Sequence, residues 1–163
     1  MAFVVSKLNL DDLNGRTGTF EHAATGITMT FRPFSDAKFQ KAYNMLEIRQ
    51  RADIEAIKQA RLGNELLDNI SEDDKTADEL LVMAIAKFLI TDWDLVDEEG
   101  KKLPVSADNF VLLLMQLPES QQIAIVAWAM DCAGKVSQAK VEKLTQTKKK
   151  PSSATRGKKT SAD

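Results

Sequence analysis

Three segments of this chain are apolar over almost their whole length, and they restrict its fold more than any other feature. They span residues 80–90, 110–117 and 123–130, and the first is interrupted only by Lys87. Each is far shorter than the roughly twenty apolar residues that a membrane-spanning helix needs. Such segments must be covered by other protein on most sides, so we expect them to be helices at the centre of one domain.

A β-hairpin is predicted over residues 17–32. Apolar and polar residues alternate from Ile27 to Arg32, after a turn that ends at Gly26, and this period of two is typical of a strand with one buried face. A two-stranded ribbon is only marginally stable, so its apolar face should pack on helices. The predicted fold class is α+β and mostly α, with the N-terminal β-hairpin packed on a bundle of about four helices.

Capping residues and helix breakers predict where the helices begin and end. N-caps are expected at Ser35, at Thr76 or Asp78, and at Ser106, and Pro118 should start the last helix. Gly63 and Gly134 are expected to end the first and last helices. Between the second and third helices, residues 91–105 carry an acidic turn at Glu99 and Gly100, which predicts a second short hairpin or loop.

Charge is divided unevenly along the chain. Residues 1–134 carry 13 basic and 22 acidic side chains, a net charge of −9, whereas residues 135–163 carry 9 basic and 2 acidic ones, a net charge of +7. The second segment has no large apolar residue after Leu144, so it buries too little surface to offset chain entropy. We therefore predict a globular domain over 1–134 and a disordered, Lys-rich tail over 135–163.

The residue types that carry catalysis or bind metals are scarce. His22 is the one histidine and Cys132 the one cysteine, and neither stands beside a residue that would activate it as a base or nucleophile. The acidic residues 92–99 do not fit the EF-hand spacing, and no glycine-rich phosphate loop is present. We expect a protein that is not an enzyme, with no cofactor and no metal.

The apolar helices hold more large side chains than one shared core needs. Part of this surface is expected to form a groove for a partner helix. The candidate partner-binding residues are Phe110, Leu113, Leu114, Leu117 and Trp128. Burial in the core remains the alternative for each of them.

Several short motifs follow one another in a distinctive order. Leu-Asn-Gly-Arg at 13–16 and Thr-Gly-Ile at 25–27 precede Thr-Asp-Trp-Asp-Leu-Val-Asp at 91–97, which is followed by Gly-Lys, by Leu-Pro-Val-Ser at 103–106 and by Leu-Pro at 117–118. In this order, over residues 13–134, the sequence resembles the tail assembly chaperones of long-tailed bacteriophages. The aspartate-tryptophan segment is the most distinctive part of the resemblance.

The resemblance implies a non-catalytic protein of the host bacterial cytoplasm that is absent from the mature virion. It would bind the tape measure protein and keep it soluble while the tail tube polymerises around it. The family also makes a longer, frameshifted form that recruits tail tube protein, and Lys148–Lys150 are candidates for a slippery adenine run.

An alternative function rests on the basic tail. Lysines over 135–163 would neutralise nucleic-acid phosphates, giving an accessory protein whose binding falls steeply with salt. No aromatic residue is interleaved with these lysines, so bases have nothing to stack on and this reading is less favoured. The chain begins without the long apolar stretch of a secretion signal, no membrane partner is expected, and self-association stays open.

Overall fold

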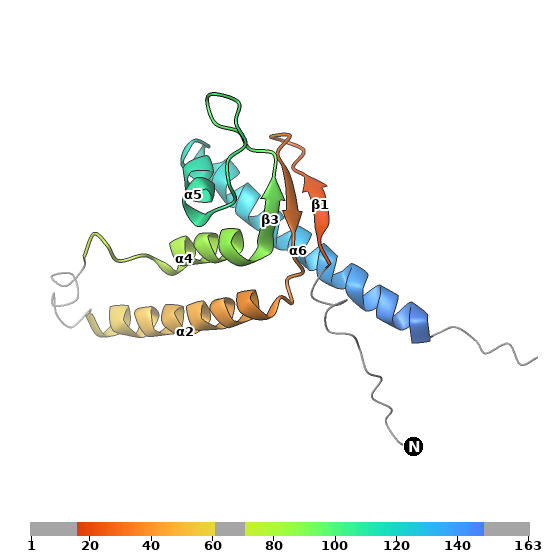
Figure 1. Ribbon diagram of the computed structural model, residues 1–163. Helices are drawn as coiled ribbons and strands as arrows, with labels where there is room; N and C mark the ends of the chain where they lie inside the picture. Colours follow the sequence, from red (N-terminus) through yellow and green to blue (C-terminus); the bar gives the residue numbers. More distant parts are fainter. Residues whose placement is uncertain (1–15, 61–70, 149–163) are drawn as a thin grey trace, which may run out of the picture.

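The computed structural model describes residues 16–60 and 71–148, with side chains described as far as residue 139 (Figure 1). The fold class is confirmed: the described residues form four helices and a small antiparallel sheet that contains the predicted hairpin. In chain order the elements are β1 (Gly18–Glu21), β2 (Thr28–Phe31), α2 (Ala37–Ala60), α4 (Ala77–Ala84), the π-helical turn η1 (Ile85–Leu89), β3 (Ile90–Trp93), α5 (Ala107–Met115) and α6 (Glu119–Lys148).

The sheet has the order β1-β2-β3, and one of its faces packs on helices. One cross-strand row points inward and consists of Phe20, Met29 and Trp93. The neighbouring row is polar and consists of Thr19, Thr30 and Asp92. Residue alternation therefore gives the sheet a core face and a solvent face, as is common in antiparallel sheets. The predicted side-chain arrangement of β2 is confirmed, since Met29 and Phe31 are fully buried.

Strand β3 begins at Ile90, the last residue of the predicted helical segment, and continues into the segment predicted as a second hairpin or loop; its pairing with β2 is not predicted by the sequence. Helix α4 passes into η1, and Ile90 then adopts an extended backbone with φ −81° and ψ 124°. The backbone N–H of Arg32 donates to the carbonyl of Leu89 at 2.7 Å, which ties this turn to the end of β2. A fully buried strand and a buried helix have the same composition, so only tertiary pairing distinguishes them.

Two of the predicted N-caps are confirmed and one is wrong. Thr76 forms a reciprocal capping box with Glu79, and Ser106 accepts a hydrogen bond from the backbone of Asn109 at 3.1 Å. At α2 the cap is Asp36 instead of Ser35, because its Oδ1 accepts from the N–H groups of residues 38 and 39 at 3.0 Å each. The helix stop expected at Gly63 lies outside the described residues.

The second hairpin or loop is observed as a tight turn after β3. Val96 pairs with Lys102 across it, and the backbone N–H of Gly100 donates to the carbonyl of Asp97 at 3.0 Å. Gly100 has a φ of +77°, a conformation that glycine adopts without steric cost. The acidic residues of this turn project beyond the sheet, at the top of Figure 1.

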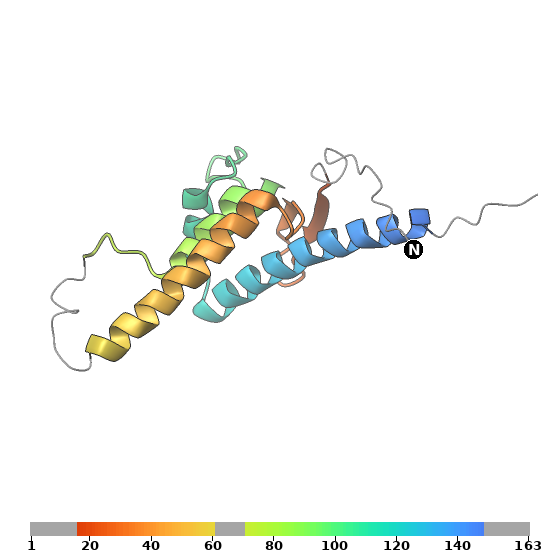
Figure 2. The ribbon, with the colours of Figure 1, turned by 90° about the horizontal axis from the view of Figure 1, so that it is seen from below.

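Helix α6 does not end at Gly134, so that prediction is wrong. The helix continues to Lys148 and runs across the sheet (Figures 1 and 2). Ala133 is fully buried and Val136 is 6% exposed, so packing on both sides of Gly134 outweighs the roughly 1 kcal/mol that a helical glycine costs. A Cβ on Gly18 would lie 2.8 Å from Cγ2 of Val136. Strand β1 therefore closes onto α6 beyond the predicted domain boundary at 134, while residues 149–163 lie outside the described part of the chain.

Ending the chain after Gly134 is expected to lower the free energy of unfolding by at least about 2 kcal/mol, because Val136 and its contact with β1 are lost. Ending it after Lys148 should leave the stability unchanged. Urea unfolding followed by circular dichroism measures both variants. Equal stability of the two truncated chains would contradict the packing of α6 beyond Gly134.

Helix α2 is only partly covered by its neighbour α4. In Figure 2, α2 and α4 lie side by side, and α2 continues past the start of α4. None of the described helices has both the length and the apolar character that crossing a bilayer requires.

Candidate functional site

The five predicted partner-binding residues fall into two groups. Phe110 is fully buried and Leu114 is 7% exposed, so these two belong to the core and offer no surface to a partner. Phe110 stacks on Trp93 with ring centroids 6.5 Å apart, which joins α5 to the sheet. Leu113 and Leu117 are half-buried and pack against the same core.

Trp128 holds α6 against the hairpin. It is half-buried, and its ring meets Phe31 edge-on at 5.3 Å and His22 at 5.1 Å between centroids. His22 lies in the β1–β2 turn, as predicted, where Nδ1 is 2.9 Å from Oγ1 of Thr25. Most of the Trp128 ring therefore contacts other residues of this chain.

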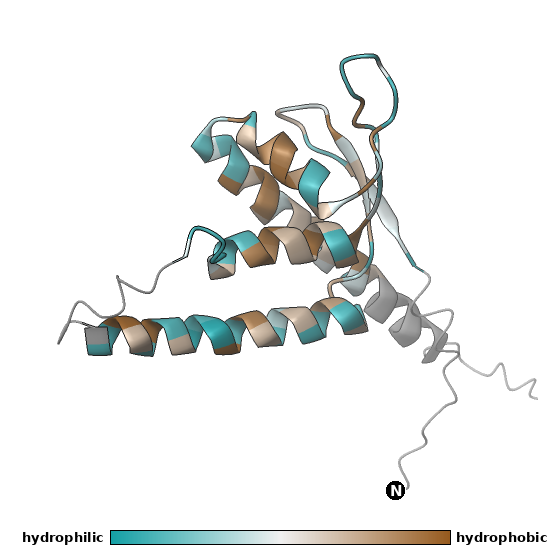
Figure 3. Cartoon of the chain, turned by 60° about the vertical axis from the view of Figure 1, so that its left-hand side comes forward, coloured by the Kyte–Doolittle hydropathy of each residue, from teal (hydrophilic) through white to brown (hydrophobic). Residues whose placement is uncertain are grey.

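Three large apolar residues of α5 and α6, the helices joined by residues 116–118, are exposed. Leu112 is 54% exposed, Met115 is 73% exposed and Ile123 is 66% exposed. We call these three residues the α5–α6 corner. The brown of apolar residues covers much of α5 in Figure 3, and an exposed apolar group on adjoining helix ends is typical of an interaction surface.

The connection at the corner is well ordered by hydrogen bonds. Nε2 of Gln122 donates to the carbonyl of Leu117 at 2.8 Å, and the N–H of Leu117 donates to Leu114 at 3.0 Å. Pro118 directly precedes α6, and its carbonyl accepts from the N–H groups of Gln121 and Gln122 at 2.9 and 3.0 Å. These bonds fix the direction in which both helix ends present their exposed side chains.

Sequence reasoning missed Leu112 and Met115 because residues 110–115 are all apolar. Positions i and i+4 share a helix face, so burial of Phe110 also turns Leu114 inward and leaves Leu112 and Met115 outside. The helical repeat of about 3.6 residues separates a buried face of α5 from an exposed one. Without a polar residue in the segment, nothing in the sequence says which face is buried.

Helix α2 carries a second set of exposed apolar residues. The set consists of Met45, Ile48, Ile54 and Ile57. Ile54 and Ile57 follow Tyr43 and Leu46 by eleven residues, which is close to three helical turns, so they continue the face that packs on the core. They are exposed because α2 extends past α4.

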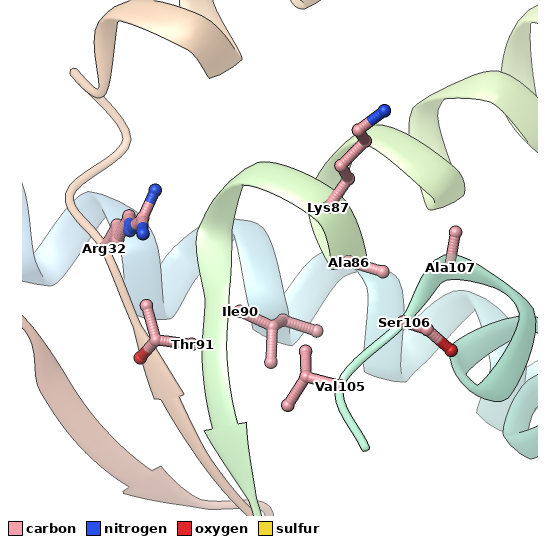
Figure 4. A pocket seen from close by; sticks show the side chains of 8 residues that line it. All are labelled: Arg32, Ala86, Lys87, Ile90, Thr91, Val105, Ser106 and Ala107. Carbon is pink, nitrogen blue, oxygen red and sulfur yellow. The ribbon is translucent and has the colours of Figure 1, made fainter.

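A pocket of about 460 Å³ opens beside the first residues of β3 (Figure 4). Ala86, Ile90 and Val105 give it an apolar floor, and Arg32 and Lys87 stand at its edge, with the Lys87 side chain directed away from Ile90 and Val105. Thr91, Ser106 and Ala107 complete the lining. We call this the cationic pocket. Apolar floor and positive rim together suit an apolar side chain that has carboxylates beside it.

Two titratable groups have shifted pKa values for different reasons. Hydrogen bonding to Lys102, at 2.6 Å, lowers the pKa of Asp92, with a smaller contribution from the backbone of Trp93. Burial raises the pKa of the Cys132 thiol to about 11, so very little thiolate forms near neutral pH. In the described parts of the chain, no three His, Cys, Asp or Glu side chains are grouped closely enough to hold a metal ion.

The model of the YdaY prophage protein family matches residues 35–150, well over half of the chain. The chain belongs to this family. As a YdaY prophage protein it is of phage origin, and the match includes α2, α4, α5 and α6 together with the whole α5–α6 corner. No curated protein and no solved structure matches the sequence.

Proposed function

We propose that this YdaY prophage protein is a tail assembly chaperone. It binds the tape measure protein, keeps that long helical protein soluble and promotes polymerisation of the tail tube around it. The proposal is supported by the phage origin of the family and by the resemblance over residues 13–134. It acts in the host bacterial cytoplasm, is absent from the mature virion and catalyses no reaction.

The observation that carries the proposal is the α5–α6 corner. An amphipathic helix is recognised by apolar side chains that contact its i, i+3, i+4 and i+7 positions. Leu112 and Met115 are three residues apart on α5, and Ile123 is the exposed fifth residue of α6, the next helix along the chain. Half-buried Leu113 and Leu117 lie between them along the chain and retain part of their surface for a ligand. A tape measure segment laid across this corner would bury its own apolar face.

Co-expression with the tape measure protein of the same phage tests the proposal. We expect a larger soluble fraction of the tape measure protein and co-purification of the two chains, because covering apolar helix faces prevents their aggregation. A soluble helical protein of similar charge, expressed in place of this chain, controls for a general effect on expression. No gain in solubility together with no co-purification would refute the proposal.

The tail tube protein is a second proposed partner, recruited by a longer frameshifted form. Mass spectrometry of phage-infected or prophage-induced cells would detect peptides that run past residue 148 into another reading frame. If no such peptides are found while the shorter form is detected at high coverage, the proposed recruitment through a longer form is wrong.

The competing function, a nucleic-acid-binding accessory protein, is favoured by one feature of the fold. Helix α6 extends from the sheet into the segment of residues 135–163, whose net charge is +7. That function requires affinity for nucleic acid that falls steeply with salt and vanishes on removal of residues 135–163. Nucleic-acid binding that meets both conditions, with no effect on the solubility of the tape measure protein, would favour this function over the chaperone.

A further inference from the structure

The acidic turn after β3 presents an apolar side chain among carboxylates. We define this turn as residues 94–100. Val96 is 55% exposed and is flanked by Asp94 and Asp97, with Glu98 and Glu99 following. Val96 thus adds nothing to the core and stands beside these carboxylates, while Lys102, which pairs with it across the turn, binds Asp92 at 2.6 Å.

The acidic turn is fixed in place before any partner arrives. Oδ1 of Asp97 accepts hydrogen bonds from the N–H groups of Glu99 at 3.0 Å and Lys101 at 2.8 Å. The N–H of Leu103 donates to the carbonyl of Leu95 at 2.9 Å. Little ordering entropy is therefore lost when the turn binds, and this favours recognition by such a segment.

The cationic pocket has the opposite charge and a matching apolar floor. Arg32 and Lys87 line it together with Ile90 and Val105 (Figure 4). A valine seated on this floor would place the neighbouring carboxylates near the two cations. Such pairing of opposite charges around an apolar contact gives an interface its specificity.

The turn and the pocket of one molecule do not meet. The pocket includes Ile90 and Thr91 at the start of β3, whereas the turn follows Trp93 at its end. Figure 1 shows the turn projecting away from the sheet, and the pairing of Val96 with Lys102 holds it there. Any cationic pocket that this turn enters must therefore belong to another molecule.

We infer that the acidic turn of one copy of this chain docks in the cationic pocket of a second copy, with Val96 on the apolar floor and the carboxylates of Glu98 and Glu99 paired with Arg32 and Lys87. The contact joins two different surfaces, so it is heterologous and builds a ring or an open chain of molecules. It does not depend on the proposed chaperone function, because no residue of the α5–α6 corner takes part.

Charge reversal on each side tests the contact. The pocket variant carries Arg32→Glu and Lys87→Glu, and the turn variant carries Glu98→Lys and Glu99→Lys; Asp97 is left intact because it holds the turn together. Each variant alone opposes like charges and should associate at least about tenfold more weakly than the unmodified chain. A mixture of the two restores opposite charges at every contact, so association should return. Sedimentation velocity over a range of protein concentrations at low salt measures it.

Further variants keep the test decisive. Lys38→Glu with Lys41→Glu makes the same change of charge at exposed positions on α2 and should not alter association. Lys87→Glu alone changes only an exposed residue, so it replaces the pocket variant if that variant does not fold. Val96→Asn leaves all charges in place and should weaken association by removing the apolar contact. A chain that stays monomeric at low salt, or a mixture that does not regain association, would overturn the inference.

Discussion

Phe110→Ala is expected to lower the free energy of unfolding by about 3–5 kcal/mol, which is the usual range for truncating a fully buried phenylalanine. Phe110 is 0% exposed and its ring stacks on Trp93. The change would therefore leave a cavity between α5 and the sheet that neither element can close. Urea unfolding followed by circular dichroism gives the free energy directly.

The matched control lies two residues further along the same helix. Leu112 is 54% exposed, so Leu112→Ala should change the stability by no more than about 0.5 kcal/mol. If both variants lost the same stability, the division of α5 into a core face and a surface face would be wrong. Phe110 is thus expected to act through folding, although the sequence alone suggests it as a contact residue.

Replacing all three residues of the α5–α6 corner with glutamine is expected to weaken binding of the tape measure protein at least tenfold, or about 1.4 kcal/mol. Leu112→Gln, Met115→Gln and Ile123→Gln remove exposed apolar surface, and glutamine is a good helix former. Stability should therefore change little. Pull-down of the tape measure protein by each purified variant measures the binding.

Met45→Gln with Ile48→Gln provides the control on α2, where the two side chains are 70% and 68% exposed. This variant removes comparable apolar surface elsewhere and should bind as the unmodified chain does. Loss of binding in the α2 variant, with the corner variant unaffected, would move the binding surface to α2. Loss in neither variant would exclude both exposed groups as the contact.

Local patterns in the sequence predict the parts of the fold that local chemistry decides. Strict alternation from Ile27 onward predicts strand β2, and Thr76, one of the two N-caps expected for α4, is the residue that caps it. Both depend on residues within a few positions of each other. Strand β3 and the continuation of α6 through Gly134 depend on partners far along the chain, such as the contact of Val136 with Gly18, and no local pattern reports them.

The candidate site divides in the same way. The sequence indicates that residues 110–117 hold surplus apolar side chains, and the exposed positions of Leu112 and Met115 agree with that surplus. It cannot assign the faces, because uniform apolarity removes the contrast on which a helical period depends. The cationic pocket cannot be predicted from the sequence, since Arg32 and Lys87 lie 55 positions apart and line one pocket only because β2 pairs with β3.

Helix α6 is a single rod of 30 residues, about 45 Å long at 1.5 Å per residue. It begins at the corner, crosses the sheet and ends among lysines, with no break at Gly134. A ligand held at its first turns and an anion drawn to its last turns would thus be kept at a nearly constant separation. The helix can serve as a spacer as well as a packing element, and its length, unlike that of a flexible linker, fixes how far apart two bound partners stand.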